Sequence, residues 1–225
     1  MLFGLACEGI TDQITIENIL CGYFKNPELD EDITELQPPL DETDQTQGGG
    51  GWPILLKYLT STRFRDDVLN TEFIILQIDS DIADKLGVAH KDPFGNELST
   101  ELVISGVRTK LIESINIGVP EFYQTHAPKI IFAICVHSLE CWLVSYHAEQ
   151  TAMHDCFDVL KTVINSNVIR VAKKQKNYKK LSEPFLDRMN IDTVAKKDLS
   201  FRVFIEALST IEKQVYQFND ERYMQ

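Results

Sequence analysis

Three short, mostly apolar segments stand out along the chain, and each one is followed by polar or acidic residues. They cover residues 2–7, 72–78 and 129–136. Segments of this length that are apolar at both odd and even positions are typical of parallel strands covered by helices on both faces. The pattern therefore predicts three strands of one buried parallel sheet.

Amphipathic segments lie between and after these strands, with apolar residues at helical spacing and suitable capping residues. The predicted helices cover about 12–24, a segment opened by Pro53, about 97–117 and a segment after Ser138. Residues 82–96 read as a loop, and residues 150–225 carry helical patterns only. Alternating strands and helices predict an α/β fold with helices on both faces of the sheet. We expect a core over residues 1–149 and a helical C-terminal extension over 150–225 that packs on it.

The charge of the chain is unevenly distributed. The chain has 22 Lys and Arg against 34 Asp and Glu, a formal net charge of −12. Residues 26–51 contain no Lys or Arg, but they include Pro38-Pro39 and end in four glycines. Acidic residues crowd the part from Glu28 to Asp44. This composition predicts a mobile acidic surface loop.

Residues 159–182 have the opposite balance, because they contain basic residues and no Asp or Glu. A local basic patch can bind a phosphate backbone even on an acidic protein, although a solvated helix face explains the same pattern. The candidates for contact with nucleic acid are Lys173, Lys174, Lys176, Lys179 and Lys180.

The overall composition, the longest apolar run and the cysteine spacing exclude several classes of protein. Hydrophobic residues make up 44% and charged residues 25%, which excludes a disordered or fibrous chain. The longest apolar run, 130–136, is far too short to span a membrane, and the N-terminus lacks the pattern of a secretory signal. The five cysteines show no metal or redox spacing. We therefore expect a cytoplasmic protein with reduced thiols and no membrane partner.

Acidic and titratable residues follow all three predicted strands. Glu8 follows the first, Asp79 and Asp81 end the second, and His137 with Glu140 follows the third. Sites in open α/β sheets lie at the carboxyl ends of the strands. Carboxylates held close together favour a hard cation such as Mg²⁺ or Mn²⁺. The sequence therefore predicts a metal site at this edge.

Each of these residues also has an ordinary structural explanation. Asp79 and Asp81 are of a type that favours turns, and Glu8 precedes a glycine. A helix dipole stabilises an acid such as Glu140 in a first turn, and a histidine such as His137 is more often structural than catalytic. The functional interpretation therefore depends on all the acids falling at the same edge.

Five strings resemble segments of one family. Residues 8–12 (EGITD) and 78–81 (IDSD) are similar to the first two motifs of Toprim domains. Residues 49–52 (GGGW), 137–143 (HSLECWL) and 199–204 (LSFRVF) resemble further segments of small RloB-type Toprim proteins from bacterial phage-defence loci. The resemblance spans most of the chain, and 137–143 is its most discriminating part.

The resemblance implies a Toprim-like, Rossmann-type sheet and a metal-dependent nuclease that uses Mg²⁺ or Mn²⁺. Glu8 would be the general base or acid and also touch the metal, with Asp79 and Asp81 as metal ligands. Glu140 would be a ligand or an orienting residue, and Asp12 a supporting carboxylate. The chain is too short for the extra domains of a topoisomerase or primase, which leaves hydrolysis of DNA or RNA.

The family setting also implies an effector role in anti-phage defence, an ATPase partner of the ABC/SMC-like or AAA class, and the option of a homo-oligomer. The acidic stretch 28–44 is a candidate for binding a partner or covering the site. Three alternatives stay open: a phosphatase of the haloacid-dehalogenase type, a receiver-like phosphoacceptor domain, and a non-catalytic Toprim-like scaffold or sensor that binds nucleic acid or a partner protein.

Overall fold

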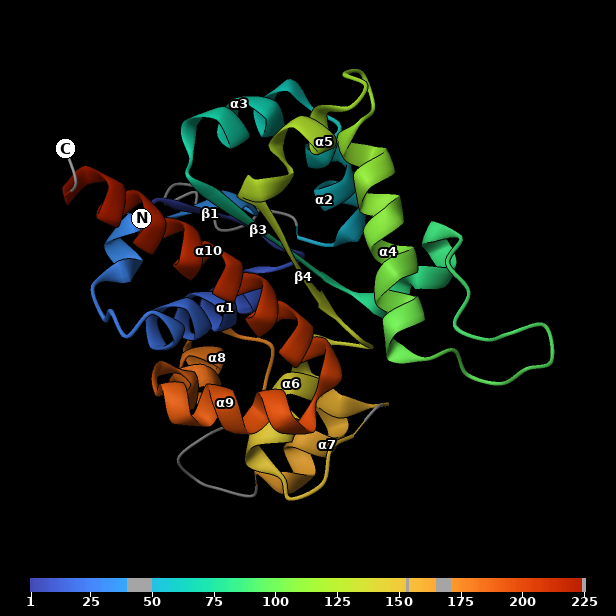
Figure 1. Cartoon of the computed structure of the whole chain (residues 1–225). Helices are drawn as coiled ribbons and strands as arrows, with labels where there is room; N and C mark the ends of the chain where they lie inside the picture. The colour runs from blue at the N-terminus through green and yellow to red at the C-terminus, as the bar shows by residue number, and fades with distance from the viewer. Residues whose placement is uncertain (40–49, 153, 165–170, 224–225) are drawn as a thin grey trace.

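The computed structural model describes residues 1–39, 50–152, 154–164 and 171–223 (Figure 1). The chain forms an α/β fold around one four-stranded sheet, in which all neighbouring strands are parallel and the order is β2-β1-β3-β4. The strands are β1 (Phe3–Ala6), β2 (Ile33–Gln37), β3 (Phe73–Asp79) and β4 (Ile130–Cys135). The predicted fold class is confirmed, and the three predicted strands are β1, β3 and β4.

Alternate residues of each central strand enter two separate hydrophobic cores, because successive side chains of a strand point to opposite faces of the sheet. On β3, Phe73 and Ile75 join one core, whereas Ile74 and Leu76 join the other. All four side chains are buried. Burial on both faces explains why this strand is apolar over most of its length.

Helices cover both faces of the sheet (Figure 1). One face carries α1 (Ile10–Tyr23), α6 (Leu139–His147), α7 (Cys156–Val163), α8 (Gln175–Ser182), α9 (Arg188–Lys197) and α10 (Leu199–Tyr223). The other carries α2 (Trp52–Leu59), α3 (Thr62–Asn70), α4 (Thr100–Ile115) and α5 (Phe122–His126). Within the described residues, no helix combines the length and apolarity needed to cross a bilayer.

The segment 26–51 is not the continuous loop that its acidic composition predicts. A 3₁₀ helix (Leu29–Asp32) is followed by β2, which pairs with β1 at the edge of the sheet. Ile33 and Leu36 of this strand are buried. The acidic and polar residues around them hide the strand signal in the sequence, because this edge strand, unlike β4 at the opposite edge, is partly exposed and has few apolar positions. The remainder of the predicted loop, residues 40–49, lies outside the described residues.

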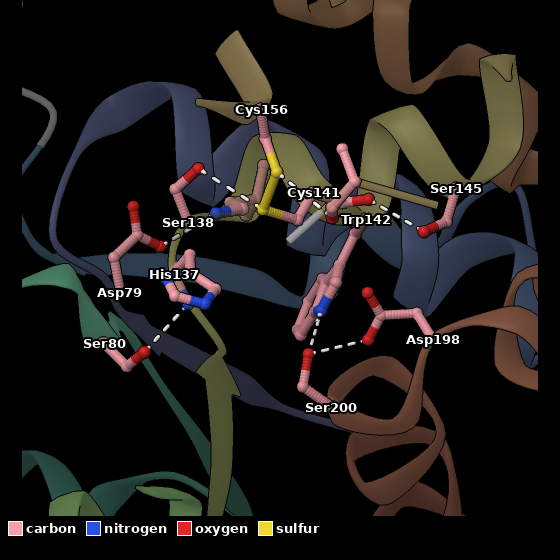
Figure 2. Close-up of a disulfide and its surroundings, with 12 residues drawn as sticks. Asp79, Ser80, His137, Ser138, Cys141, Trp142, Ser145, Cys156, Asp198 and Ser200 are labelled. Atoms are coloured by element: carbon pink, nitrogen blue, oxygen red, sulfur yellow. Dashed lines mark hydrogen bonds between the residues drawn. A yellow bond between two sulfur atoms is a disulfide. The ribbon is translucent and has the colours of Figure 1, made fainter. Parts of the chain in front are cut away.

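Trp142 of α6 joins the core to the helical C-terminal extension. Its fully buried ring stacks on Phe204 at 5.7 Å between centroids and meets Phe201 edge-on at 5.0 Å. Its indole N–H donates to the hydroxyl of Ser200 at 2.7 Å, and that hydroxyl donates to Asp198 (Figure 2). A large aromatic ring whose polar group is satisfied stabilises a core strongly. The extension is therefore packed directly against the helix that follows β4.

A disulfide joins Cys141 of α6 to Cys156, the first residue of α7 (Figure 2). The expectation of reduced thiols is wrong for this pair. Cys7, Cys21 and Cys135 are buried free thiols, in line with that expectation. The pairing is not readable from the sequence, because it depends on how α6 and α7 pack together.

Reduction of this disulfide is expected to lower the free energy of unfolding by about 2–3 kcal/mol, because it releases the closed loop between the two cysteines. The two are 15 residues apart in the sequence. Urea denaturation with and without dithiothreitol measures the effect. The Cys141→Ser/Cys156→Ser double variant should show no further loss on reduction. Equal midpoints for oxidised and reduced wild type would contradict the expectation.

Candidate active site at the carboxyl end of the sheet

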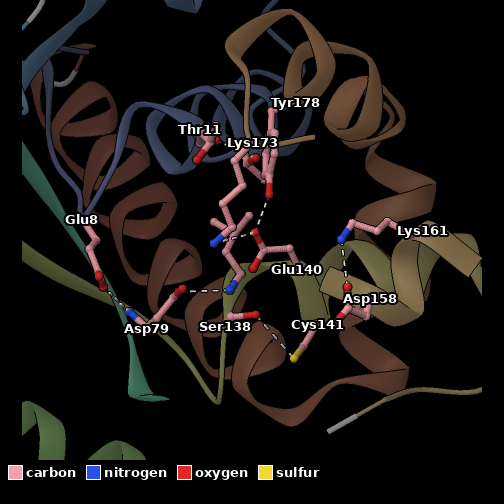
Figure 3. Close-up of polar contacts among 12 residues, drawn as sticks. Glu8, Thr11, Asp79, Ser138, Glu140, Cys141, Asp158, Lys161, Lys173 and Tyr178 are labelled. Atoms are coloured by element: carbon pink, nitrogen blue, oxygen red, sulfur yellow. Dashed lines mark hydrogen bonds and ion pairs between the residues drawn. The ribbon is translucent and has the colours of Figure 1, made fainter. Parts of the chain in front are cut away.

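The exit of β1 places Glu8 at the carboxyl end of the two central strands. Its backbone N–H donates to Oε1 of Gln77 at 3.1 Å, and its carbonyl oxygen accepts from the N–H of Gly51 at 2.6 Å. Its carboxylate accepts from the backbone N–H of Asp79 at 3.4 Å (Figure 3). The expected convergence of Glu8 with the end of β3 is therefore confirmed.

Two glycines before α2 allow the chain to close against this turn. A Cβ atom at Gly50 would lie 2.7 Å from the carbonyl oxygen of Glu8, which is too close for any side chain. Gly51 has a φ of 111°, in the region that favours glycine. Glycine at these positions is therefore a geometric requirement of the site.

Asp79 links β3 to the start of α6. Its Oδ1 accepts from Nε2 of Gln77 at 3.0 Å and from the backbone N–H of Leu139 at 3.0 Å. Gln77 precedes Asp79 by two positions and therefore projects from the same face of the strand. Leu139 is the first residue of α6, so the carboxylate faces the N-terminus of a helix, where negative charge is stabilised.

Glu140 is held by residues of the C-terminal extension. Its side chain is only 5% exposed and accepts a hydrogen bond from the hydroxyl of Tyr178. The ammonium group of Lys173 lies 3.6 Å from the same carboxylate oxygen (Figure 3). The Lys173 side chain is 65% exposed and thus reaches Glu140 from the surface. Lys173 and Tyr178, which both belong to the 159–182 segment, are therefore part of the site.

Asp81 and Asp12 complete the set of acids. Asp81 is exposed in the 3₁₀ helix after β3 (Ser80–Leu86), and its backbone N–H donates to the carbonyl of His137 at 3.0 Å. Asp12 is half-buried in the first turn of α1. We call the following five residues the acidic cluster: Glu8, Asp12, Asp79, Asp81 and Glu140.

Burial and mutual repulsion raise pKa values throughout the acidic cluster. Burial raises the pKa of Asp12 to about 8, and the charges of Glu140 and Glu8 contribute further. Burial and the neighbouring acids also hold the pKa of Asp79 well above its usual range. The pKa values of Glu8 and Asp81 are raised as well, chiefly because neighbouring protein atoms partly exclude water from the carboxylates. Carboxylates that resist ionisation in this way are stabilised by a cation.

The five candidate lysines for nucleic-acid contact divide into two groups. Lys173 forms the ion pair with Glu140 inside the site. The other four side chains are exposed on α8 or immediately before it: Lys174, Lys176, Lys179 and Lys180. Their contact with a phosphate backbone stays a prediction.

Two residues of the site, Gln77 and Tyr178, were missed from the sequence, and Lys173 was predicted only as a contact for nucleic acid. Gln77 was detectable in principle, since it lies two positions before Asp79 on a predicted strand and must share its face. Tyr178 and the inward contact of Lys173 had no such signal. Both depend on where the extension folds back relative to α6, which no spacing rule provides.

The donor atoms of the acidic cluster fit a hard divalent cation, because they are carboxylate oxygens whose charges repel one another. In the described part of the chain, however, no three Asp, Glu, His or Cys side chains already surround one point closely enough to hold a metal ion. A cation at Glu8, Asp79 and Asp81 therefore requires side-chain rotation.

No family model matches the chain, and no curated protein or solved structure matches it either. The Toprim resemblance therefore rests on the residues quoted above and stays a prediction. What the structure establishes independently is the parallel sheet and the acidic cluster at its carboxyl edge.

Proposed function

We propose that this chain is a metal-dependent nuclease that hydrolyses phosphodiester bonds of DNA or RNA at the acidic cluster. The observation that carries the proposal is the meeting of the β1 exit, the β3 exit and the start of α6 around Asp79. Carboxylates gathered at the carboxyl edge of a parallel sheet suit chemistry on a phosphoryl group, provided that a cation joins them.

Each side chain has a role that follows from its position. Glu8 takes the proton from the attacking water, because its carboxylate lies beside Asp79 at the edge of the site. Asp79 and Asp81 would hold Mg²⁺ or Mn²⁺, which supplies positive charge toward the phosphoryl oxygens and lowers the pKa of a bound water. Glu140 orients Lys173, whose exposed ammonium group can meet a phosphate oxygen.

The wider setting belongs to the same proposal and is supported by the resemblance alone. It comprises a cytoplasmic anti-phage effector, an ATPase partner of the ABC/SMC-like or AAA class, and backbone contacts from the exposed lysines of α8. In a cytoplasmic setting Cys141 and Cys156 would be kept reduced, and their disulfide would form only on oxidation.

One observation favours a second candidate function, a non-catalytic scaffold or sensor. Glu140 is already neutralised by Lys173 and hydrogen-bonded by Tyr178. A carboxylate satisfied in this way needs no metal. In this alternative the acidic cluster binds a partner's basic surface or a structural ion.

Cleavage assays test the proposal directly. Wild-type protein is incubated with plasmid DNA, single-stranded DNA and RNA in Mg²⁺, Mn²⁺ or EDTA, and the products are resolved on gels. We expect cleavage in either metal and none in EDTA. Glu8→Gln keeps the hydrogen-bond acceptor for Asp79 but removes the base, so its rate should fall by about 10²–10⁴-fold.

The matched control is Glu113→Gln, an acid exposed on α4 that should leave the rate unchanged. Metal-dependent cleavage lost only in Glu8→Gln supports the nuclease. Binding of nucleic acid without any cleavage supports the scaffold, and hydrolysis of a small phosphomonoester alone supports the phosphatase.

A further inference from the structure

The start of α7 borders the same cavity as the acidic cluster. This cavity, of about 350 Å³, is lined by Asp79, Asp81 and Glu140 of the cluster and by residues 156–158 of α7. We call it the acidic cavity. Because α7 supplies part of its lining, the position of this helix affects the shape of the site.

Lys173 is held between the two helices α6 and α7. Its ammonium nitrogen lies 3.6 Å from a carboxylate oxygen of Glu140 on α6. The same nitrogen lies 5.5 Å from the ring centroid of Phe157 on α7. A cation at this distance from an aromatic face is attracted to it. The placement of the ammonium group therefore depends on how α6 and α7 are spaced.

The disulfide joins the residues next to both of these contacts. Cys141 follows Glu140 in the sequence, and Cys156 precedes Phe157. The bond therefore sets the spacing between the carboxylate and the ring that hold Lys173. It also lies at the edge of the acidic cavity, because Cys156 lines that cavity and Sγ of Cys141 is 4.0 Å from the hydroxyl of Ser138 (Figure 2).

Few other contacts fasten α7. Among its residues, only Cys156 and Leu160 are buried. Among the described elements, the helix packs mainly on α6. A short helix with so little buried surface depends on its attachments to stay in place. When the disulfide is reduced, Leu160 is the main remaining anchor, and α7 should leave α6 more readily.

We propose that Cys141 and Cys156 form a redox switch of the site. In the oxidised protein the disulfide fixes α7 against α6 and holds Lys173 where it can meet a phosphate oxygen. In the reduced protein α7 is released, Lys173 loses its fixed position, and phosphate binding weakens. The identity of the ligand, a nucleic-acid phosphate, rests on the proposed nuclease function.

The chemical step is a two-electron thiol–disulfide exchange with a small dithiol as the reductant. One thiolate of the reagent attacks a protein sulfur and forms a mixed disulfide, which its second thiolate then breaks. The products are two cysteine thiols, which gain the two protons, and the oxidised reagent. Oxidation is the reverse, with a small disulfide as the electron acceptor. Both cysteines are buried, but Cys156 lines the acidic cavity and Cys141 lines another of about 140 Å³, which give such a reagent a route.

The test compares the oxidised and the dithiothreitol-reduced full-length protein without requiring cleavage. Fluorescence anisotropy in Ca²⁺ measures the affinity for labelled single-stranded and duplex oligonucleotides. We expect reduction to weaken the tighter complex by about fivefold. The slope of log affinity against log salt should also become shallower, because one phosphate contact is lost. Amide hydrogen exchange should become faster in α7 and stay unchanged in β3.

Three variants locate the effect. The Cys141→Ser/Cys156→Ser double variant should bind like the reduced protein and show no response to dithiothreitol, which excludes an action on the other thiols. Lys173→Gln should bind weakly and equally in both redox states. Lys176→Gln, which removes an exposed lysine of α8, is the matched control. Its fivefold response to reduction should be kept, whatever its own affinity.

The outcomes separate the switch from the nuclease proposal. Equal affinity of the oxidised and reduced proteins, or a redox response that persists in Lys173→Gln, overturns the switch even if the protein cleaves nucleic acid. Redox-dependent binding by a protein that cleaves nothing supports the switch and refutes the nuclease. Failure of both redox forms to bind any oligonucleotide overturns the switch.

Discussion

Asp79→Asn is expected to abolish metal-dependent cleavage while raising the free energy of unfolding of the metal-free protein. The amide still accepts the hydrogen bonds from Gln77 and Leu139, so the local geometry is kept. It removes a buried negative charge that repels Asp12 and Glu140. We expect cleavage to fall by at least about 10²-fold and stability to rise by about 0.5–2 kcal/mol.

The gain in stability should depend on pH in a defined direction. Because the pKa of Asp79 is raised in the folded protein, folding favours its protonated form. Wild-type stability contributed by this group is therefore complete below about pH 4, the ordinary range of an Asp carboxyl group. It is lost as the pH rises through the folded-state pKa. The advantage of Asp79→Asn should be absent at pH 4 and present at pH 8.

Thermal unfolding in EDTA at both pH values, together with the cleavage assay, measures the two effects. Asp66→Asn, an exposed acid on α3, is the matched control and should change neither activity nor stability. An Asp79→Asn variant that is less stable than wild type at pH 8 would show that this carboxylate is structural. The same variant with full activity would remove Asp79 from the mechanism.

Trp142→Ala is expected to lower the free energy of unfolding by about 3–5 kcal/mol, the usual cost of truncating a large buried aromatic side chain. It removes the stacking on Phe204 and the edge-on contact with Phe201, and it leaves the hydroxyl of Ser200 without its indole partner. Since α10 packs on β4 through this region, the extension should loosen together with the core. Urea denaturation followed by circular dichroism gives the magnitude.

The second tryptophan of the chain supplies the comparison. Trp52, at the start of α2, is half-buried, so Trp52→Ala should cost about 1 kcal/mol or less. If Trp142→Ala unfolds in a single cooperative transition with a lower midpoint, the core and the extension form one folding unit. Two separate transitions in wild type would show instead that residues 150–225 unfold on their own.

The strands that the sequence predicts are the ones whose side chains are buried on both faces of the sheet. β1, β3 and β4 are covered on both faces and read as apolar runs, whereas β2 is partly exposed, contains Glu35 and was taken for loop. The parallel arrangement of the strands also explains why part of the site could be predicted. Glu8 and Asp79 were found because parallel strands bring their carboxyl ends together.

The parts that escaped prediction depend on packing between distant elements. Lys173 and Tyr178 reach Glu140 only because the chain after α7 folds back over α6 and α1. The disulfide has the same origin, since Cys141 meets Cys156 through the contact of α6 with α7. Hydrophobic periodicity reports which face of a helix is buried, but it carries no information about which helix lies opposite.

The turn that carries Glu8 is hydrogen-bonded on both sides, to the last residue of β2 and to the residue before α2. Cys7 donates its N–H to the carbonyl of Gln37 at 2.7 Å, and Gly51 donates to the carbonyl of Glu8 at 2.6 Å. Doubling the length of a connection costs only about 0.6 kcal/mol in closure entropy. Residues 40–49 are therefore the natural position for grafting an affinity tag or a fluorescent reporter without displacing the carboxyl edge of the sheet.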